Sequence, residues 1–240
     1  MGILKKFRKR AKDSFFYNIF QNIFHTPLKS YSDCYGEDLF VKNYFENKKN
    51  GFYLDVGCNQ PKKNSLTFHL HKKGWTGINI DISERCIKLY NHFRRKDINL
   101  NVSLGSKEKN VEAFIFYNNC TMNTVDNKFK NYTINSVNKI PETKKIKQLT
   151  LNKIISDYKV SKIDYLNIDV EGYEMEVLKG FSIKNMMPSL VSIEIHDSEC
   201  PPVNSDVYKF FIKNRFTLVS IYGWTYFFES KKNRNVHFKL

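Results

Sequence analysis

The sequence predicts an α/β fold built on a doubly wound, mostly parallel sheet. Strand-like and helix-like segments alternate at short spacing between residues 52 and 104, as successive βα units do. Two apolar runs, at 52–56 and 163–168, lead to a carboxylate and a glycine-containing turn, the form that parallel strands take at a ligand crevice. With 240 residues, 41% of them hydrophobic, the chain can form one catalytic-sized domain.

Residues 1–30 are predicted to be a basic amphipathic extension ahead of a domain at 31–240. Basic residues between positions 5 and 12 precede apolar residues at helical spacing, namely Phe15, Phe16, Ile19, Phe20, Ile23 and Phe24. Such a segment either packs on the domain or lies on a membrane surface through residues 5–24. It has neither a small-residue cleavage site nor a long apolar core, so we expect a cytoplasmic protein, with membrane association left open.

The first half of the domain is predicted to open with a turn and an amphipathic helix over residues 31–45. Strands are expected at 52–56, 78–81 and 98–104, and helices at 65–73 and 84–93 between them. The order βαβαβ is typical of a doubly wound sheet.

The second half begins with a strand at 111–117 and a polar stretch at 118–147, which predicts a surface loop or active-site cover. Helices are expected at 149–158 and 171–180, and strands at 163–168 and 189–195. Residues 216–222 and 225–229 flank Gly223 and Trp224 as an antiparallel hairpin.

The net charge of +15 raises the question of nucleic-acid binding, but the basic residues are scattered, so such binding is not expected. The five cysteines are odd in number and far apart, which indicates reduced, structural thiols. Trp75 and Trp224 are expected to be packing residues rather than stacking platforms.

Polar residues follow the ends of several predicted strands: Asp55 and Gly57, Asp81, Asp169, and Glu194 with His196. Carboxyl ends of parallel strands meet at one edge of the sheet, so these residues should share a crevice. Asp81 lies 26 residues after Asp55, near the interval at which an acid binds ribose hydroxyls, which indicates an adenosine-type cofactor. Asn59 and Pro61 stand where a dinucleotide motif has glycines, so nicotinamide and flavin are disfavoured.

Several motifs resemble, in order and spacing, the FkbM family of S-adenosylmethionine-dependent methyltransferases. They are Gly36-Glu37-Asp38, Asp55-Val56-Gly57-Cys58-Asn59-Gln60-Pro61, Asn64-Ser65-Leu66-Thr67, Gly74 to Asp81 and Ile168-Asp169-Val170-Glu171-Gly172-Tyr173-Glu174. The resemblance implies a Rossmann-like class I methyltransferase fold with a seven-stranded sheet. It also implies methyl transfer, usually to oxygen, on a sugar, a glycolipid or polysaccharide precursor, or a secondary metabolite. Asp81 departs from the pattern, since many relatives have Glu followed by Pro.

The expected cofactor-binding residues are Glu37, Asp55, Gly57, Asn59, Ser65, Asp81 and Asp169. Gly57 would let the backbone approach the ligand, and Ser65 would cap a helix that points at the cofactor carboxylate. Asp81 can accept hydrogen bonds from ribose hydroxyls as Glu does.

The candidate catalytic residues are Asp169, Glu171 and His196, one of which would accept the proton of the acceptor hydroxyl. Each also has a structural interpretation: Asp169 as the N-cap of a helix, Glu171 as an acid in its first turn, and His196 as a surface histidine. The same three are candidate ligands of Mg²⁺ or Mn²⁺, within a cluster that also holds Glu194, Asp197 and Glu199.

Two other functions stay open: a non-catalytic partner protein that binds the cofactor, and an RNA-directed methyltransferase, which only the charge favours. Acceptor specificity is expected to lie in residues 118–147 and 197–206, where no motif identifies the acceptor.

Overall fold

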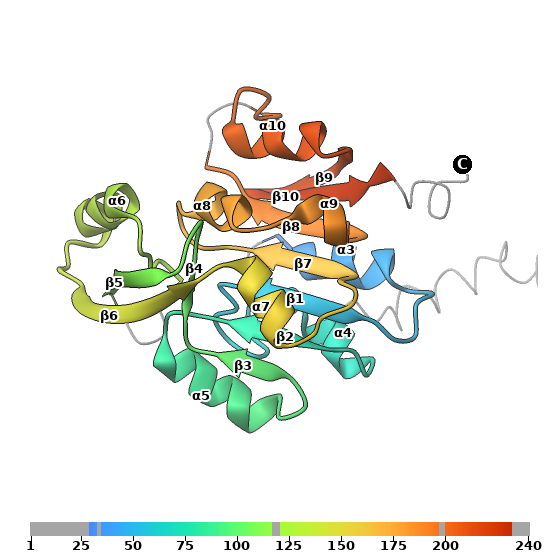
Figure 1. Ribbon diagram of the computed structural model, residues 1–240, viewed down its shortest axis with the longest axis horizontal. Helices are drawn as coiled ribbons and strands as arrows, with labels where there is room; N and C mark the ends of the chain where they lie inside the picture. The colour runs from blue at the N-terminus through green and yellow to red at the C-terminus, as the bar shows by residue number, and fades with distance from the viewer. Residues whose placement is uncertain (1–28, 33–34, 117–120, 197–199, 232–240) are drawn as a thin grey trace, which may run out of the picture. The chain divides into compact units, whose positions relative to one another are not determined.

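The computed structural model describes residues 29–32, 35–116, 121–196 and 200–231 (Figure 1). The chain divides into two units, Met1–Ser30 and Tyr31–Leu240. Residues 5–24, and with them the expected membrane contact, lie outside the described residues. Within the described ranges, no helix combines the length and the apolar character needed to cross a bilayer.

Seven strands form the main sheet in the order β3-β2-β1-β7-β8-β10-β9 (Figure 1). Their bounds are β1 Phe52–Val56, β2 Thr76–Ile80, β3 Ile98–Leu100, β7 Tyr165–Ile168, β8 Leu190–Glu194, β9 Phe216–Tyr222 and β10 Thr225–Ser230. The first five strands in that order are parallel, and β10 is antiparallel to both β8 and β9. The direction in which strands are added reverses at β1, and ligands bind at such switch points.

Helices cover both faces of the sheet because side chains alternate between the faces along each strand. Leu54 and Ile78 belong to an apolar core with α7 Leu151–Asp157, α8 Glu174–Lys179, α9 Ile183–Met186 and α10 Asp206–Lys213. Tyr53 and Tyr165 belong to a second core with α3 Glu37–Tyr44 and α4 Phe68–Lys72. Helix α5 Glu84–Phe93 packs Ile87 and Tyr90 against Cys58.

A smaller sheet in the order β4-β6-β5 joins Ser103–Leu104, Glu142–Leu149 and Lys109–Ile115. The prediction of a loop over 118–147 was wrong, because this stretch contains helix α6 Asn127–Val137 and most of strand β6. Most side chains of β6 are exposed, so the strand lacks an apolar alternation. Its conformation depends on antiparallel backbone pairing with β5, which polar side chains permit.

Two helices differ from their expected bounds. The helix expected at 65–73 is only the five residues of α4, and the one expected from 171 begins at Glu174. In both cases the residues before the helix make side-chain contacts that hold a loop in place, as described below.

Candidate active site

Two adjoining cavities lie at the carboxyl ends of β1, β2, β7 and β8. The first has the apolar side chains Ile82, Val102 and Leu104 beside Asp81. The second is more polar and is lined by Glu37, Asp55, Ser65, Asn167, Glu171, Glu194 and Thr225, among others. Both are lined by Gly57, Asn59, Thr121 and Asp169, so they form one continuous groove. All seven residues expected at the cofactor line this groove, although their expected roles are not thereby tested.

Gly57 brings the end of β1 against the end of β7. Its φ is +77°, and a Cβ at this position would lie 1.6 Å from the backbone oxygen of Asp169. Only glycine fits there, because both the conformation and the space exclude a side chain. Gly57 thus lies directly against the end of β7, and the two residues at this contact, Gly57 and Asp169, line both cavities.

Asp81 closes the turn after β1. Its carboxylate accepts hydrogen bonds from the backbone N–H groups of Asn59 at 2.8 Å and Ser83 at 2.7 Å. Asn59 adopts a left-handed conformation with φ of +50°, which turns its N–H toward the carboxylate. Burial raises the pKa of Asp81 to about 6, against the opposing effect of the two backbone donors. Asp81 is therefore mostly ionised at neutral pH, with acceptor positions left for a ligand.

Asp55 is buried and both of its carboxylate oxygens already accept hydrogen bonds. Thr67 donates to one at 2.7 Å and the Asn167 amide donates to the other at 3.0 Å. Asn167 in turn accepts from Ser192 at 2.6 Å, whose hydroxyl lies 2.6 Å from that of Tyr165. The Asp55 carboxylate thus connects β1 to β7 and β8, and it also lines the second cavity.

Arg94 anchors the other end of this hydrogen-bonded chain. Its guanidinium, on a residue only 1% exposed, donates to Thr67 at 2.7 Å, to Ser65 at 2.7 Å and to the Pro61 carbonyl at 2.5 and 2.9 Å. It thereby fixes the loop between Gly57 and α4 from beneath. Arg94 is not among the residues predicted from the sequence, because no sequence pattern distinguishes it from the neighbouring basic residues.

Ser65 does not cap a helix, which corrects the expected role. The residue preceding α4 is Thr67, and its side chain makes no capping hydrogen bond. Both hydroxyls are instead taken up by Arg94, and that of Thr67 also by Asp55, because a buried guanidinium needs acceptors for its donors.

Glu37 lies at the start of α3 and lines the second cavity. Its carboxylate accepts from the Ser32 hydroxyl at 2.8 Å and from the Tyr35 backbone N–H at 3.2 Å. These contacts hold Ser32, which also lines the second cavity, beside the start of α3.

The loop from Asp169 to Tyr173 corrects two further expectations. Asp169 is not an N-cap and Glu171 is not in the first turn of a helix, since α8 begins only at Glu174. Glu171 and Gly172 have φ values of +55° and +95°, which a helix does not allow. Glu174 holds the loop in this form by accepting from the backbone N–H groups of Val170 and Gly172, both at 3.2 Å.

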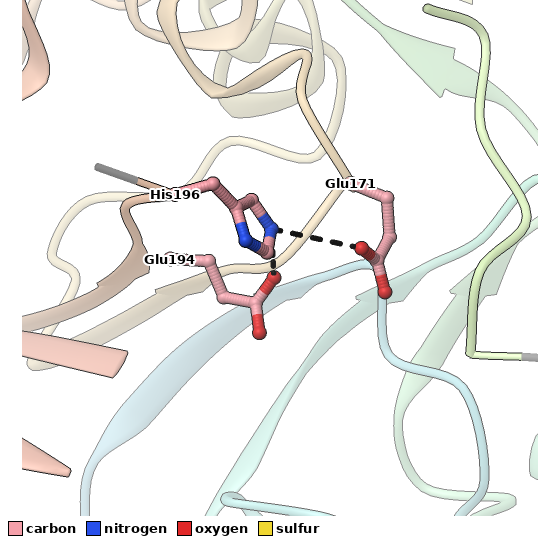
Figure 2. A group of neighbouring side chains, drawn as sticks. All are labelled: Glu171, Glu194 and His196. Carbon is pink, nitrogen blue, oxygen red and sulfur yellow. Dashed lines mark ion pairs between the residues drawn. The ribbon is translucent and has the colours of Figure 1, made fainter. Parts of the chain in front are cut away.

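This loop brings Glu171 to the end of β8, where His196 and Glu194 lie (Figure 2). The imidazole Nε2 of His196 is 3.1 Å from Glu194 Oε2 and 3.7 Å from Glu171 Oε2. The Glu171 side chain is 12% exposed and that of His196 is 36% exposed, so the imidazole is the more accessible of the two. His196 is therefore not an isolated surface histidine.

The carboxyl groups of Asp169, Glu171, Glu174 and Glu194 lie close together and partly buried, so their charged forms repel one another. The pKa of Glu171 is raised to about 9, mainly by burial and further by the charges of Glu194 and Glu174. The pKa of Asp169 is raised well above its usual range by burial and by the charges of Glu194, Glu171 and Glu174. The hydrogen bond with Glu194 raises the pKa of His196 above its ordinary value. Carboxyl groups that favour the protonated form therefore lie close to the imidazole.

The donor atoms of Glu171, Glu194 and His196 all lie within 4.8 Å of one another. Of the candidate metal ligands, Asp169 is not part of this set, and Asp197 and Glu199 lie outside the described residues. Cys58 is buried and burial raises the pKa of its thiol, so a nucleophilic role does not suit it.

Comparison with known protein families gives one match: a profile described as Methyltransferase FkbM domain matches residues 55–218. Searches of curated proteins and of solved structures returned no significant match. The matched range begins at Asp55 and includes every residue after it that lines the groove, except Thr225.

Proposed function

Because this chain belongs to the FkbM methyltransferase family and is thus a methyltransferase, we propose that it transfers a methyl group from S-adenosylmethionine to a hydroxyl oxygen. The acceptor would be a sugar, a glycolipid or polysaccharide precursor, or a secondary metabolite. The observation that carries the proposal is the continuity of the groove, which joins Asp81 to the group of Glu171, Glu194 and His196. The strand order, with its reversal at β1, supports a Rossmann-like class I methyltransferase fold.

The first cavity suits an adenosine. Ile82, Val102 and Leu104 offer apolar surface for a flat base, and the ionised Asp81 offers acceptor oxygens to ribose hydroxyls. Asp169 and the Gly57 turn, which both cavities share, would hold the portion of the cofactor nearest the reacting atoms. When bound, S-adenosylmethionine supplies an electrophilic methyl group on a sulfonium.

The second cavity would hold the acceptor. Positioning an oxygen in line with the methyl carbon contributes most of the barrier lowering in such a displacement, and a base need only remove the hydroxyl proton. We assign that base to His196, which is the most accessible member of its group and is held by Glu194 at 3.1 Å. Asp169 and Glu171, whose raised pKa values favour the protonated carboxyl, would donate hydrogen bonds to the acceptor.

The test combines cofactor binding with transfer of a labelled methyl group. Calorimetry with S-adenosylmethionine and S-adenosylhomocysteine should show binding that Asp81→Ala abolishes. His196→Ala should lower kcat by about 10²–10⁴ while leaving cofactor affinity unchanged. Asp157→Ala, an exposed acid on α7, is the matched control and should leave both unchanged.

The acceptor panel should contain pyranosides, nucleotide sugars, lipid-linked saccharides and RNA. Labelling of RNA alone would overturn the proposed acceptor in favour of an RNA-directed enzyme. Cofactor binding without any transfer would favour a non-catalytic partner protein, and absence of cofactor binding would refute the proposal as a whole.

A second role proposed for Glu171, Glu194 and His196 is the binding of a divalent cation. Two carboxylates and an imidazole suit Mn²⁺ or Mg²⁺, and a cation would offset the repulsion among the acids. An imidazole bound to a metal cannot also accept a proton, so the two roles of His196 exclude each other. Calorimetry with Mn²⁺ decides between them: saturable binding that is lost in Glu171→Gln and retained in Glu112→Gln, on the remote β5, would favour the metal.

A further inference from the structure

The two tryptophans of the chain lie in opposite surroundings. Trp75 is 1% exposed and packs in the core, as expected. Trp224, also expected to pack, is 49% exposed at the turn between β9 and β10. Its carbonyl accepts from the Ile195 backbone N–H at 3.0 Å, which fixes the turn beside the end of β8. The indole is thus exposed on a turn that is hydrogen-bonded to the residue after β8.

Trp224 belongs to a row of rings that we call the aromatic rim: Tyr132, Phe129, His196 and Trp224. The ring centroids of Trp224 and His196 are 5.6 Å apart, those of His196 and Phe129 are 5.5 Å apart, and those of Phe129 and Tyr132 are 5.8 Å apart. Tyr132 is also largely exposed, so the rim has an exposed ring at each end. Through His196, which lies 3.1 Å from Glu194 and 3.7 Å from Glu171, the rim adjoins two residues that line the second cavity.

Polar groups lie directly beside the rim. His196 belongs both to the rim and to the group with Glu171 and Glu194, and Thr225, next to Trp224, lines the second cavity. A ligand here thus meets flat apolar surface on one side and several hydrogen-bonding oxygens on the other. A pyranose ring has the matching form, with C–H groups on one face and hydroxyls around its edge.

We propose that the aromatic rim is the acceptor subsite, and that a pyranose ring of the acceptor stacks on Trp224 with its reacting hydroxyl directed toward His196. The inference rests on the proposed function and specifies its acceptor as a pyranoside. An aromatic acceptor would use the rings but would leave most of the oxygens unpaired. A quaternary ammonium would suit the rings, but it has no N–H group to donate to the neighbouring oxygens.

Tryptophan fluorescence tests the inference without requiring turnover. Acrylamide should quench Trp224 and spare the buried Trp75, so methyl pyranosides should protect the quenchable emission in the presence of S-adenosylhomocysteine. Sorbitol, an acyclic polyol with similar hydroxyls but no ring face, should give no protection. The Trp224→Phe variant should lose the saccharide-dependent signal and keep the emission of Trp75.

Kinetics separate stacking from a general structural effect. Trp224→Ala should raise the KM for a pyranoside acceptor about tenfold with kcat within about twofold, and Trp224→Phe should stay near wild type. Phe93→Ala, which removes an exposed ring at the end of α5, is the matched control and should change neither value.

Two outcomes would overturn the inference. One is protection by choline or catechol in place of pyranosides, and the other is an unchanged KM in Trp224→Ala. Both require a chain that binds S-adenosylhomocysteine by calorimetry, so they are distinct from failure of the proposed function, in which the cofactor itself does not bind.

Discussion

Gly57 has two separate reasons to be glycine, and a pair of substitutions can measure each. Gly74 also has a positive φ, +94°, but a Cβ there would have no atom within 4 Å. Gly74→Ala should therefore cost only backbone strain, about 1–2 kcal/mol of unfolding free energy. Gly57→Ala should cost clearly more, because its Cβ would also overlap the backbone of Asp169. Urea denaturation of both variants measures the difference, and equal losses would contradict the close contact.

Asp81 gives the groove a pH dependence. With a pKa raised to about 6 by burial, the carboxyl group is protonated below that pH and loses acceptor capacity. The Kd for S-adenosylmethionine should therefore rise as pH falls through about 6, and should be nearly constant above about 7. Calorimetry between pH 5 and 8 checks this, and the dependence should vanish in Asp81→Asn. A flat profile in the wild-type chain would argue against Asp81 as a cofactor ligand.

The sequence alone was sufficient to predict the groove residues that lie at the ends of apolar strands. Asp55, Gly57, Asp81 and Asp169 follow apolar runs, and all of them reach the groove. What the sequence did not reveal is which oxygens are already bonded. Asp55 is held by Thr67 and Asn167, and such partners come from segments more than ten residues away in the chain. Only the fold brings them together.

Helix α5 has a role beyond covering the sheet, since Arg94 at its C-terminal end holds the loop after β1. Arg94→Lys should lower the free energy of unfolding by about 3–5 kcal/mol, because an ammonium cannot satisfy the acceptors that a guanidinium reaches in several directions. Arg85→Lys, on the same helix, is the matched control. Thermal or urea unfolding measures both.

If Arg94→Lys proved as mild as Arg85→Lys, the hydrogen bonds to Pro61, Ser65 and Thr67 would not be what holds the loop. A fall in stability accompanied by weaker cofactor binding would connect α5 to the groove directly.

The elements with apolar periodicity were predicted well, and the polar ones were not. Strands β1, β7 and β8 match their expected ranges closely, since they are buried on both faces. Helix α6 and strand β6 were expected to be loop, because their exposed side chains carry no apolar signal. An N-cap signal did exist: Asp126 accepts from the Phe129 backbone N–H at 2.7 Å and begins α6.

For the molecule as a whole, the membrane contact of residues 5–24 stays a prediction from charge and apolar spacing. The full chain should bind vesicles that contain anionic lipid and should not bind neutral ones, because each basic residue near an anionic surface contributes about 1 kcal/mol. Cosedimentation measures the binding, and raised salt should weaken it. Replacing Lys5, Lys6 and Arg8 by Glu should abolish it. Equal binding to both kinds of vesicle would contradict an electrostatic contact.

The groove has two walls that are built in different ways. The wall near Asp55 and Arg94 is fixed by buried hydrogen bonds that join three strands to a helix. The other wall includes Thr124, whose hydroxyl donates to the Glu171 carbonyl at 2.8 Å, and it is followed by α6, in which Phe129 lies against Gly172. Backbone hydrogen bonds also join Thr124 to Phe114 of β5, so the smaller sheet holds this segment. Residues 126–137, which carry two rings of the aromatic rim and do not line the first cavity, therefore form a natural unit of exchange, through which one scaffold acquires new acceptors while its cofactor end stays constant.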